Sequence, residues 1–581
     1  MENYLKRYID WLTSDYVDTA TKKELASIKD NEDEIKIRFL SNMEFGTGGL
    51  RSKMCAGCGM MNTYTVAQAT EGVARTITKL IDNAAERGVA ICYDSRNNSP
   101  IFAKRSADVL TAHGIKVYLF NELHPTPMLS FAVRHLNCAA GINITASHNP
   151  KEYNGYKFYW EDGAQPTSQI ADIVSKNIYE TDIFEDVPRP SEADDSLITI
   201  LGKEFEEEFI AKVLDEQVYP DVIKKAADNL RIVYTPLCGA GYRIVPETLK
   251  RIGIKHLYTV DCQMTPNGNF PGLPKPNPEY PATFKESIKV AEKYDSNIII
   301  ANDPDCDRIG IMAKDKNGEF KCVTGNQMGS LLMDYIFTAL EAQNKMPKDG
   351  YVIKTIVSSE MPTAICKKHN VELFNVLTGF KFIAEVVKEH EEAGKGTFLL
   401  GYEESYGYMK GSYSRDKDGV VAAMLICEMA AYYSLKNMTM IDAVEELYRK
   451  YGYYMENSAE IYMEGLDGKE KISALMDKLR NNKPQTIAGS RVINIRDYLS
   501  QKSEDTITGE VKETGLPSSN VMYYLTESGC VVVARPSGTE PKIKFYILAN
   551  GADEKEAQSN VKACTNDLED MLGIPHNSLK K

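Results

Sequence analysis

The chain has 581 residues, of which 43% are hydrophobic and 26% charged, as in globular proteins, and this length predicts three to five domains. Its net charge of −14 lacks the basic excess of a duplex nucleic-acid binder, and it requires any bound phosphate to be held by a local cluster of cations and backbone N–H groups. No apolar run approaches the roughly 20 residues that span a bilayer, and the N-terminus lacks the apolar core of a signal peptide. We expect a cytoplasmic protein with no nucleic-acid or membrane partner; the sequence does not indicate an oligomeric state.

The twelve cysteines are scattered, and several lie in apolar runs. This pattern favours reduced, buried thiols over a disulfide scaffold. Cys55 and Cys58 form a lone CxxC pair without the second ligand pair that zinc sites usually have, so we do not favour a metal or redox role there.

In chain order, residues 1 to about 40 show helical spacing, and three similar sets of strands and helices follow. The first set has strands at 89–96, 115–120 and 138–146 with a helix at 64–81 before them, the second has strands at 230–241, 255–260 and 296–303, and the third has strands at 350–359, 371–379 and 396–405. Each set places polar residues at strand ends. The alternation predicts α/β units with mixed or parallel sheets and ligands outside the strand carboxyl ends.

After about residue 450 the pattern changes to α+β with short strands, and residues 503–520 are polar and turn-rich, which predicts a surface excursion. Composition places domain boundaries at 187–196, near 325 and near 450.

The segment DPDCDR, Asp303 to Arg308, forms a predicted loop between two buried strands. Alternating Asp303, Asp305 and Asp307 can turn toward one point in an extended loop. Three converged carboxylates need a hard divalent cation such as Mg²⁺ or Ca²⁺. An EF-hand is excluded because Arg308 and Lys314 replace the required glycine and glutamate. The pattern favours a metal site over an acidic turn.

The segment NITASHNP places Ser147 beside His148 at the end of a predicted strand. The G-x-S-x-G elbow of α/β-hydrolases is absent here. Taken alone, the pattern indicates a turn or a helix cap. The carboxylate loop adds another interpretation, because a phosphoserine oxygen would be a suitable hard ligand for its metal.

Three further loops offer polar groups. ARPSGTEPK (534–542) combines cations, hydroxyls and glycine and suits a phosphate, but it also fits a solvated hairpin turn. GYEESYG (401–407) could bind sugar hydroxyls or be an acidic surface turn. FGTGGLRSKM (45–54) allows close backbone approach to an anion.

These five motifs, together with NGYKF, TGFKFI (378–383) and SRDKDG (414–419), resemble the α-D-phosphohexomutase family and span residues 45–544. TASHNP, the DxDxDR loop and the SGTEPK loop are specific in combination. The resemblance is to the long phosphoglucomutase and phosphopentomutase branch. It implies an α/β protein with four domains around a central cleft: three related α/β units with mixed sheets at 1–205, 206–325 and 326–450, and a C-terminal α+β domain at 451–581.

The resemblance also implies the functional residues. Ser147 would carry a phosphoryl group, and one Mg²⁺ would bind Asp303, Asp305, Asp307 and the serine phosphate. The implied catalytic residues are Ser147, Lys157, His148, Arg51, Arg308 and Lys381. The implied substrate-binding residues are Glu403, Ser405, Thr378, Gly379, Arg415, Lys417, Arg535, Ser537, Gly538 and Thr539.

The implied reaction interconverts α-glucose 1-phosphate and glucose 6-phosphate through a phosphoserine enzyme, with glucose 1,6-bisphosphate as intermediate and activator. Mannose or pentose phosphates are alternative substrates. A Mg²⁺-dependent sugar phosphatase and a non-catalytic sugar-phosphate sensor are alternatives from other classes. The general base is Lys157, given a depressed pKa, or His148.

Overall fold

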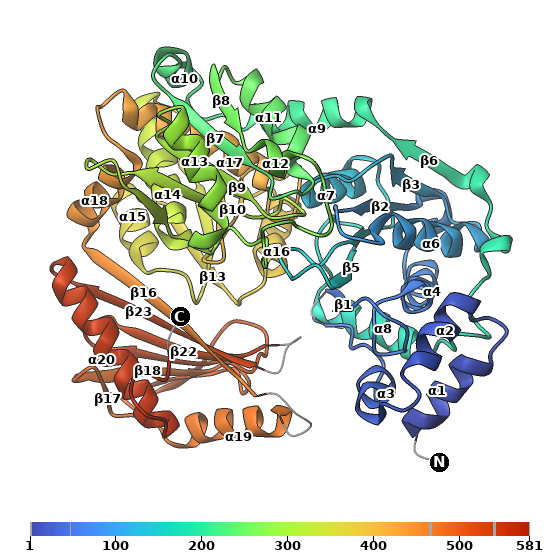
Figure 1. Cartoon of the computed structure of the whole chain (residues 1–581). Helices are drawn as coiled ribbons and strands as arrows, with labels where there is room; N and C mark the ends of the chain where they lie inside the picture. Colours follow the sequence, from blue (N-terminus) through green and yellow to red (C-terminus); the bar gives the residue numbers. More distant parts are fainter. Residues whose placement is uncertain (1–2, 47, 464–467, 538–541, 580–581) are drawn as a thin grey trace. The chain divides into compact units, whose positions relative to one another are not determined.

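We describe a computed structural model of the chain over residues 3–46, 48–463, 468–537 and 542–579 (Figure 1). Two compact units divide the chain: the first comprises residues 1–324, 384–394 and 405–440, and the second comprises residues 325–383, 395–404 and 441–581. Each unit is described separately. No helix within the described ranges is both long and apolar enough to cross a membrane.

The first unit begins with the predicted helical segment, which forms α1 (Asn3–Thr13), α2 (Thr19–Ser27) and α3 (Glu32–Phe39). Trp11 of α1 and Phe39 of α3 pack edge to face with ring centroids 5.8 Å apart, and Leu25 of α2 belongs to the same buried hydrophobic cluster. Asp18 caps α2 by accepting hydrogen bonds from two backbone N–H groups.

The first sheet confirms the predicted strands β2, β3 and β4 and adds three that the sequence did not predict, β1, β5 and β6. Its order is β1 (Gly49–Lys53), β5 (Tyr153–Tyr159), β4 (Ala140–Ile144), β2 (Val89–Tyr93), β3 (Val117–Phe120) and β6 (Ile198–Leu201). Strands β4, β2, β3 and β6 are parallel, whereas β5 is antiparallel to both β4 and β1. Its helices are α4 (Thr63–Leu80), α5 (Ala84–Arg87), α6 (Ser99–Ala112), α7 (Thr126–His135) and α8 (Ser168–Glu180), and the short turns η1 (Pro190–Glu192) and η2 (Asp195–Leu197) follow.

The second sheet of this unit repeats the arrangement. Its order is β11 (Phe320–Val323), β10 (Ile309–Lys314), β9 (Ile298–Asn302), β7 (Arg231–Thr235) and β8 (His256–Thr259). Strands β9, β7 and β8 are parallel, and β10 is antiparallel to β9 and β11. The remaining elements of the unit are α9 (Lys203–Asp215), α10 (Asp221–Ala226), α11 (Gly241–Arg251), α12 (Asp261–Met264), η3 (Pro281–Phe284), α13 (Lys285–Lys293), β15 (Gly407–Met409) and α17 (Gly419–Ser434).

The shared topology positions two motifs. In each sheet a buried parallel strand, β4 or β9, turns into an antiparallel partner, β5 or β10. The TASHNP segment occupies the first of these turns and DPDCDR occupies the second. Both motifs therefore lie at strand carboxyl ends, where the sequence predicted ligand groups.

The second unit contains the third predicted set of strands. Strand β12 (Gly350–Thr355) pairs in parallel with β13 (Glu372–Val376) and β14 (Thr397–Glu403). Its helices are α14 (Gly325–Ala342), α15 (Met361–His369), the first residues of α16 (Phe380–Ala393), and α18 (Met440–Tyr451) from its second residue onward.

An eight-stranded antiparallel sheet follows in the same unit. Its order is β16 (Tyr453–Tyr462), β23 (Lys542–Gly551), β22 (Val531–Pro536), β21 (Met522–Thr526), β18 (Ser490–Asp497), β19 (Lys502–Asp505) and β20 (Val511–Glu513), and β17 (Thr486–Ile487) pairs with β18. Helices α19 (Gly468–Asn481) and α20 (Glu554–Leu572) pack on it through one apolar core. The expectation of short strands is wrong for β16 and β23, which have 10 residues each. The predicted excursion at 503–520 is largely exposed and contains β20.

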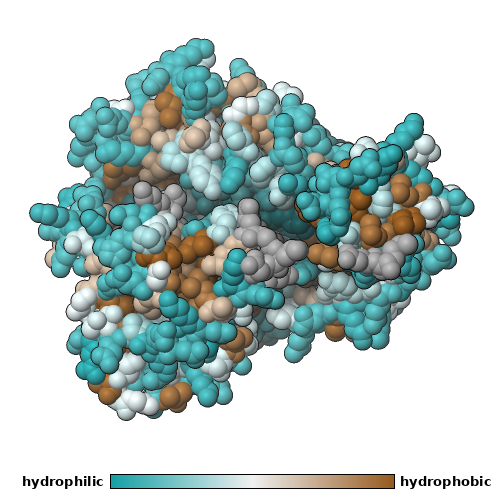
Figure 2. All heavy atoms as spheres, turned by 60° about the horizontal axis from the view of Figure 1, so that its bottom comes forward, coloured by the Kyte–Doolittle hydropathy of each residue, from teal (hydrophilic) through white to brown (hydrophobic). Residues whose placement is uncertain are grey.

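The exposed hydrophobic residues do not lie in one segment of the chain. Figure 2 shows one face on which hydrophilic residues cover most of the surface and hydrophobic residues appear in smaller areas between them. The exposed large hydrophobic residues, such as Ile37, Ile101 and Ile200, are spread along the described chain, which is normal for a protein surface.

Candidate active site

The loop after β4 places Ser147 at the centre of the first candidate group. Ser147 is buried and has a left-handed φ of 52°, a conformation that costs energy for a residue with a Cβ and often marks a functional site. Its Oγ donates to Asp303 Oδ2 at 2.8 Å and lies 3.1 Å from His148 Nδ1. Its backbone N–H donates to Thr145 Oγ1 at 2.8 Å. The structure thus joins the predicted serine to the predicted metal loop, 156 positions later.

Arg96, which the sequence reading missed, holds this loop in place. Its Nη2 donates to the carbonyl oxygens of Ser147 at 2.6 Å and Asn149 at 2.5 Å, and its Nη1 donates to those of Pro150 and Tyr153 at 2.9 and 3.0 Å. The guanidinium is buried, and Asp94 is its counterion at 3.3 Å. The one sequence feature that pointed to Arg96 was its place in YDSR, the polar end of a predicted strand.

The DPDCDR loop brings three carboxylates together in a buried place. Ligand oxygens of Asp303, Asp305 and Asp307 lie within 4.8 Å of one another, and all three residues are at most 2% exposed. Burial, together with repulsion from the other two carboxylates, raises the pKa of Asp303 well above its ordinary value. A cation would relieve this repulsion.

The free oxygens of the loop fit a hard cation. Asp305 Oδ1 and Asp307 Oδ1 are buried and accept no hydrogen bond from the described residues, and Asp307 Oδ1 lies 3.9 Å from Arg308 Nε. Buried carboxylate oxygens are costly without a partner, and all-oxygen donor sets suit Mg²⁺ or Ca²⁺. The residues present therefore fit a divalent cation.

Lys157 and His148, the two candidate bases, have different environments. Lys157 lies on β5, and its Nζ donates to Asp305 Oδ2 at 2.7 Å and Asp307 Oδ2 at 3.1 Å. Burial lowers its pKa, but these two carboxylates outweigh burial and leave the pKa raised, opposite to the depression that a base role assumed. Burial, with Arg308 and Arg51 nearby, lowers the pKa of His148 well below 6.5. His148 is therefore the group that is neutral at pH 7.

Two predicted arginines lie beside these loops. Arg51, on β1, donates from Nη1 to Asn149 Oδ1 at 3.3 Å. Arg308 donates its backbone N–H to Asp303 Oδ1 at 3.0 Å, and its guanidinium donates to Glu279 at 2.6 Å. Both arginines also reduce the pKa of His148, which places them in the electrostatic surroundings of Ser147.

The SRDKDG segment contributes Lys417 to the carboxylate loop but directs Arg415 elsewhere. Lys417 Nζ lies 3.3 Å from Asp307 Oδ2. The Arg415 guanidinium pairs with Glu391, and its backbone N–H donates to Ser130 Oγ at 2.7 Å. Ser405 is partly buried and precedes Tyr406, whose carbonyl accepts from the backbone N–H of Ile309, at the start of β10, at 3.0 Å.

In the second unit, Glu403 and the TGFK segment form one group. Glu403 ends β14 and is 6% exposed. Its Oε1 accepts from the backbone N–H of Gly379 at 2.8 Å, and Gly379 has a φ of 127° that only glycine adopts readily. The neighbouring Thr378 Oγ1 is buried and has no partner among the described residues. Lys381 lies one turn further, in α16.

The RPSGTEPK loop joins β22 to β23 in the same unit. Arg535 is the penultimate residue of β22, and the backbone N–H of Ser537 donates to the carbonyl of Lys542 at 2.8 Å. Burial and the carboxylates Glu404 and Glu403 raise the pKa of Tyr546, on β23, while Arg535 partly opposes this shift. Glu403, Glu404 and Arg535 therefore share one electrostatic environment. Gly538 and Thr539 fall outside the described residues.

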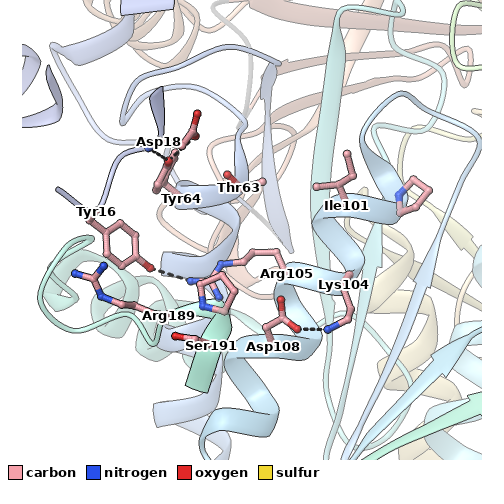
Figure 3. Close-up of a pocket in the computed structure, with 12 residues that line it drawn as sticks. Tyr16, Asp18, Thr63, Tyr64, Ile101, Lys104, Arg105, Asp108, Arg189 and Ser191 are labelled. Carbon is pink, nitrogen blue, oxygen red and sulfur yellow. Dashed lines mark hydrogen bonds and ion pairs between the residues drawn. The ribbon is translucent and has the colours of Figure 1, made fainter. Parts of the chain in front are cut away.

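A cavity of about 790 Å³ in the first unit contains none of these residues. Figure 3 shows Tyr16, Asp18 and Tyr64 on one side and Lys104, Arg105 and Asp108 on the other. Asp18 is already a helix cap, Lys104 pairs with Asp108, and Arg105 donates to Tyr16 at 2.8 Å. The polar groups hold the fold together there, so cavity size does not identify this active site.

Comparisons with known proteins point to one family. Models described as phosphoglucomutase/phosphomannomutase alpha/beta/alpha domains I, II and III match residues 42–183, 207–318 and 324–451. The phosphoglucomutase of Staphylococcus haemolyticus (strain JCSC1435) is 37% identical over 523 residues, covering 88% of this chain and 91% of that protein. The phosphoglucomutase of Staphylococcus aureus (strain MRSA252) is 36% identical over 527 residues, covering 90% and 93%.

Solved structures share the fold at lower identity. The parafusin phosphoglucomutase of Paramecium, in an open form, has a TM-score of 0.64 and 18% identity, covering 92% of this chain and 96% of that one. A phosphoglucomutase/phosphomannomutase family protein from Burkholderia thailandensis has a TM-score of 0.62 and 16% identity, covering 92% and 98%.

Proposed function

The chain belongs to the phosphoglucomutase/phosphomannomutase family, the α-D-phosphohexomutases, and we propose that it is a phosphoglucomutase that interconverts α-glucose 1-phosphate and glucose 6-phosphate. The family and the named relatives support an intramolecular phosphotransferase that acts on a sugar phosphate. The observation that carries the proposal is the 2.8 Å hydrogen bond from Ser147 Oγ to Asp303, in a buried group of three carboxylates.

In the proposed reaction, phosphorylated Ser147 donates its phosphoryl group to the free hydroxyl of a sugar monophosphate. The P–Oγ bond breaks, a P–O bond to the sugar forms, and the hydroxyl proton passes to a base. The glucose 1,6-bisphosphate then reorients, and its other phosphoryl group returns to Ser147. Such transfers are loose in character, so positioning and charge neutralisation supply most of the catalysis.

His148 suits the role of base because its imidazole is neutral at pH 7 and lies 3.1 Å from Ser147 Oγ. Lys157 donates to two carboxylates and has a raised pKa, so we assign it to charge neutralisation. With Arg51, Arg308 and Lys381, it would surround the transferring phosphoryl group.

Asp303, Asp305 and Asp307 would hold one Mg²⁺ with a phosphate oxygen on Ser147. When bound, the cation would neutralise charge on the transferring phosphoryl group. Asp305 Oδ1 and Asp307 Oδ1, which accept no hydrogen bond from the described residues, support this assignment.

The remaining candidates would bind the substrate. Glu403 and Ser405 would contact the sugar hydroxyls, with help from Thr378, Gly379, Arg415 and Lys417. Arg535, Ser537, Gly538 and Thr539 would hold the phosphate that is not reacting. We further propose four domains at 1–205, 206–325, 326–450 and 451–581, so that each carries one of these functions.

A product assay with the Ser147→Ala variant tests the proposal. Wild-type protein given glucose 1-phosphate, Mg²⁺ and a trace of glucose 1,6-bisphosphate should yield glucose 6-phosphate, whereas the variant should yield none. Release of free phosphate instead would favour a phosphatase. Faster turnover of mannose 1-phosphate or ribose 1-phosphate would reassign the substrate within the family.

A further inference from the structure

Thr126, which none of the motifs contains, contacts the carboxylate loop at two atoms. Its Oγ1 lies 2.9 Å from Asp305 Oδ2, and its backbone N–H donates to the Asp305 carbonyl at 2.8 Å. Thr126 is fully buried and is the first residue of α7, where backbone N–H groups have no partner within the helix. One residue thus holds both the main chain and the side chain of Asp305.

Asn143, on β4, fixes the direction of these hydrogen bonds. Its Nδ2 lies 2.7 Å from Thr126 Oγ1. An ionised carboxylate can only accept, so the single hydroxyl proton of Thr126 must point to Asp305. Thr126 Oγ1 then accepts from the Asn143 amide. Asn143, Thr126 and Asp305 therefore form a directed chain of donors ending on a carboxylate.

This chain determines which oxygen of Asp305 remains free. Oδ2 accepts from both Thr126 at 2.9 Å and Lys157 at 2.7 Å. Oδ1 is buried and accepts from none of the described residues. With Oδ2 satisfied by fixed donors, the carboxylate cannot rotate without breaking a buried hydrogen bond.

The same chain links the two loops of the site. Asn143 lies on the strand that ends in the Ser147 loop, and its backbone pairs with Lys157 on β5. Thr126 belongs to a different connection, 179 positions before Asp305. Asn143 begins the NITASHNP segment and Thr126 lies outside both motifs, so Thr126 adds a second link between the two loops beside the Ser147–Asp303 hydrogen bond.

We propose that Thr126, oriented by Asn143, is a positioning residue that presents Asp305 Oδ1 to the divalent cation. The inference rests on the metal site proposed above. It assigns Thr126 no contact with the substrate or the reacting atoms. Partners of this kind typically change metal affinity by 10- to 100-fold when they are removed.

A purely architectural role is the rival explanation, because Thr126 also begins a buried helix. That role needs the backbone N–H and the bulk of the side chain, and both remain in Thr126→Val. The positioning role needs the hydroxyl group of Thr126 to donate to Asp305, whereas the architectural role does not need it. An architectural residue would alter stability without altering the affinity for metal in the folded protein.

The test titrates Mn²⁺ into the full chain and measures free Mn²⁺ by electron paramagnetic resonance. We expect Thr126→Val to bind Mn²⁺ about 10 to 100 times more weakly than wild type, and Thr126→Ser to restore most of the affinity. Thr248→Val is the matched control, because Thr248 is equally buried and its hydroxyl donates to the Ile244 carbonyl of its own helix. At saturating Mg²⁺, the KM for glucose 1-phosphate should stay unchanged in Thr126→Val.

The outcomes separate the two proposals. Wild-type affinity in a folded Thr126→Val protein would overturn the positioning role and leave the metal site standing. If wild type binds no Mn²⁺, the metal site and the positioning role both fail. If Thr126→Val does not fold, Asn143→Ala replaces it: weakened Mn²⁺ binding supports the relay, and unchanged binding overturns it.

Discussion

At the scale of single residues, the chemistry of the site depends on how Ser147 is held. Its φ of 52° and its bond to Asp303 turn the hydroxyl toward the carboxylates. His148 follows it directly, and burial with two nearby arginines keeps its imidazole neutral. One short loop therefore contains both the proposed phosphoryl carrier and the candidate base.

The lowered pKa of His148 predicts how the rate depends on pH. A base with a pKa well below 6.5 is already deprotonated at pH 6.5, so the wild-type kcat should not fall between pH 8 and pH 6.5 through titration of His148. His148→Gln should reduce kcat by about 10² to 10⁴. Initial rates across this pH range, at saturating substrate, are the measurement.

The variant Lys157→Met tests the alternative that Lys157, and not His148, is the general base. If His148→Gln retained full kcat, Lys157 would replace it as the base. Lys157 would also be favoured as the base if kcat fell steeply below pH 8 in wild type but not in Lys157→Met.

At the scale of elements, Arg96 and Glu428 join segments that lie far apart in the sequence. Arg96 clamps four carbonyl groups of the Ser147 loop. Glu428, in the middle of α17, accepts from the backbone N–H groups of Val218 and Tyr219 at 3.0 and 2.9 Å. Each of these two side chains forms hydrogen bonds with backbone groups of another segment that have no partner within a helix or strand.

Replacing Arg96 should destabilise the first unit as well as the loop. Arg96→Met would leave Asp94 as an unpaired buried carboxylate, and losing one partner of a buried pair costs about 3–5 kcal/mol. Urea unfolding should show this loss, whereas Arg231→Met, at a side chain 41% exposed, should stay within about 0.5 kcal/mol of wild type. An Arg96→Met protein as stable as wild type would contradict the clamp.

Glu428 allows a graded test of the α17 anchor. Glu428→Leu would leave two backbone N–H groups without an acceptor, at about 1–3 kcal/mol each. Glu428→Gln keeps an acceptor oxygen and should lose less. Thermal unfolding should rank wild type, Gln and Leu in that order, and equal melting temperatures for Gln and Leu would contradict the role of the oxygen.

The sequence predicted the elements that are apolar in themselves and missed those formed by pairing. Strands β4 and β9 are continuous buried runs, which composition reveals. Strands β1 and β5 carry Arg, Lys, Ser and Asn, and they are strands because each pairs with a neighbour. The ten-residue length of β16 could not be predicted from an apolar run either, because most of its residues are only partly buried.

The motif residues of the site could be predicted, but their supports could not. Ser147 and the three aspartates lie in short segments with specific spacing. Arg96 and Thr126 act on residues 51 and 179 positions away, so no local pattern reports their roles. The environment of Lys157 was misjudged because its carboxylate partners come from another sheet.

At the scale of the whole molecule, the chain has a net charge of −14, which repels anions, yet the proposed site must bind a sugar phosphate. The cations Arg51, Lys157, Arg308 and Lys417 lie near the serine and carboxylate loops. They supply the local positive charge that the composition required.

The buried carboxylates also predict that a divalent cation stabilises the folded chain. Mg²⁺ at about 100 times its Kd should add about 2.7 kcal/mol to the free energy of unfolding. Removing metal with EDTA should lower the melting temperature and abolish turnover, and adding Mg²⁺ should restore both. A melting temperature that does not respond to Mg²⁺, in wild type and in Asp305→Asn alike, would contradict the metal site.

The most direct test of the central claim, phosphoryl transfer through Ser147, follows a labelled phosphoryl group. Wild-type protein and Ser147→Ala are each incubated with glucose 1,6-bisphosphate carrying ³²P, and protein-bound label is located by peptide mapping. We predict label on the Ser147 peptide of wild type and its transfer to added glucose 1-phosphate to give labelled glucose 1,6-bisphosphate. Return of the other phosphoryl group to Ser147 should then release labelled glucose 6-phosphate, and none of these events should occur in Ser147→Ala. Label on another residue, or turnover that continues in Ser147→Ala, would contradict the account.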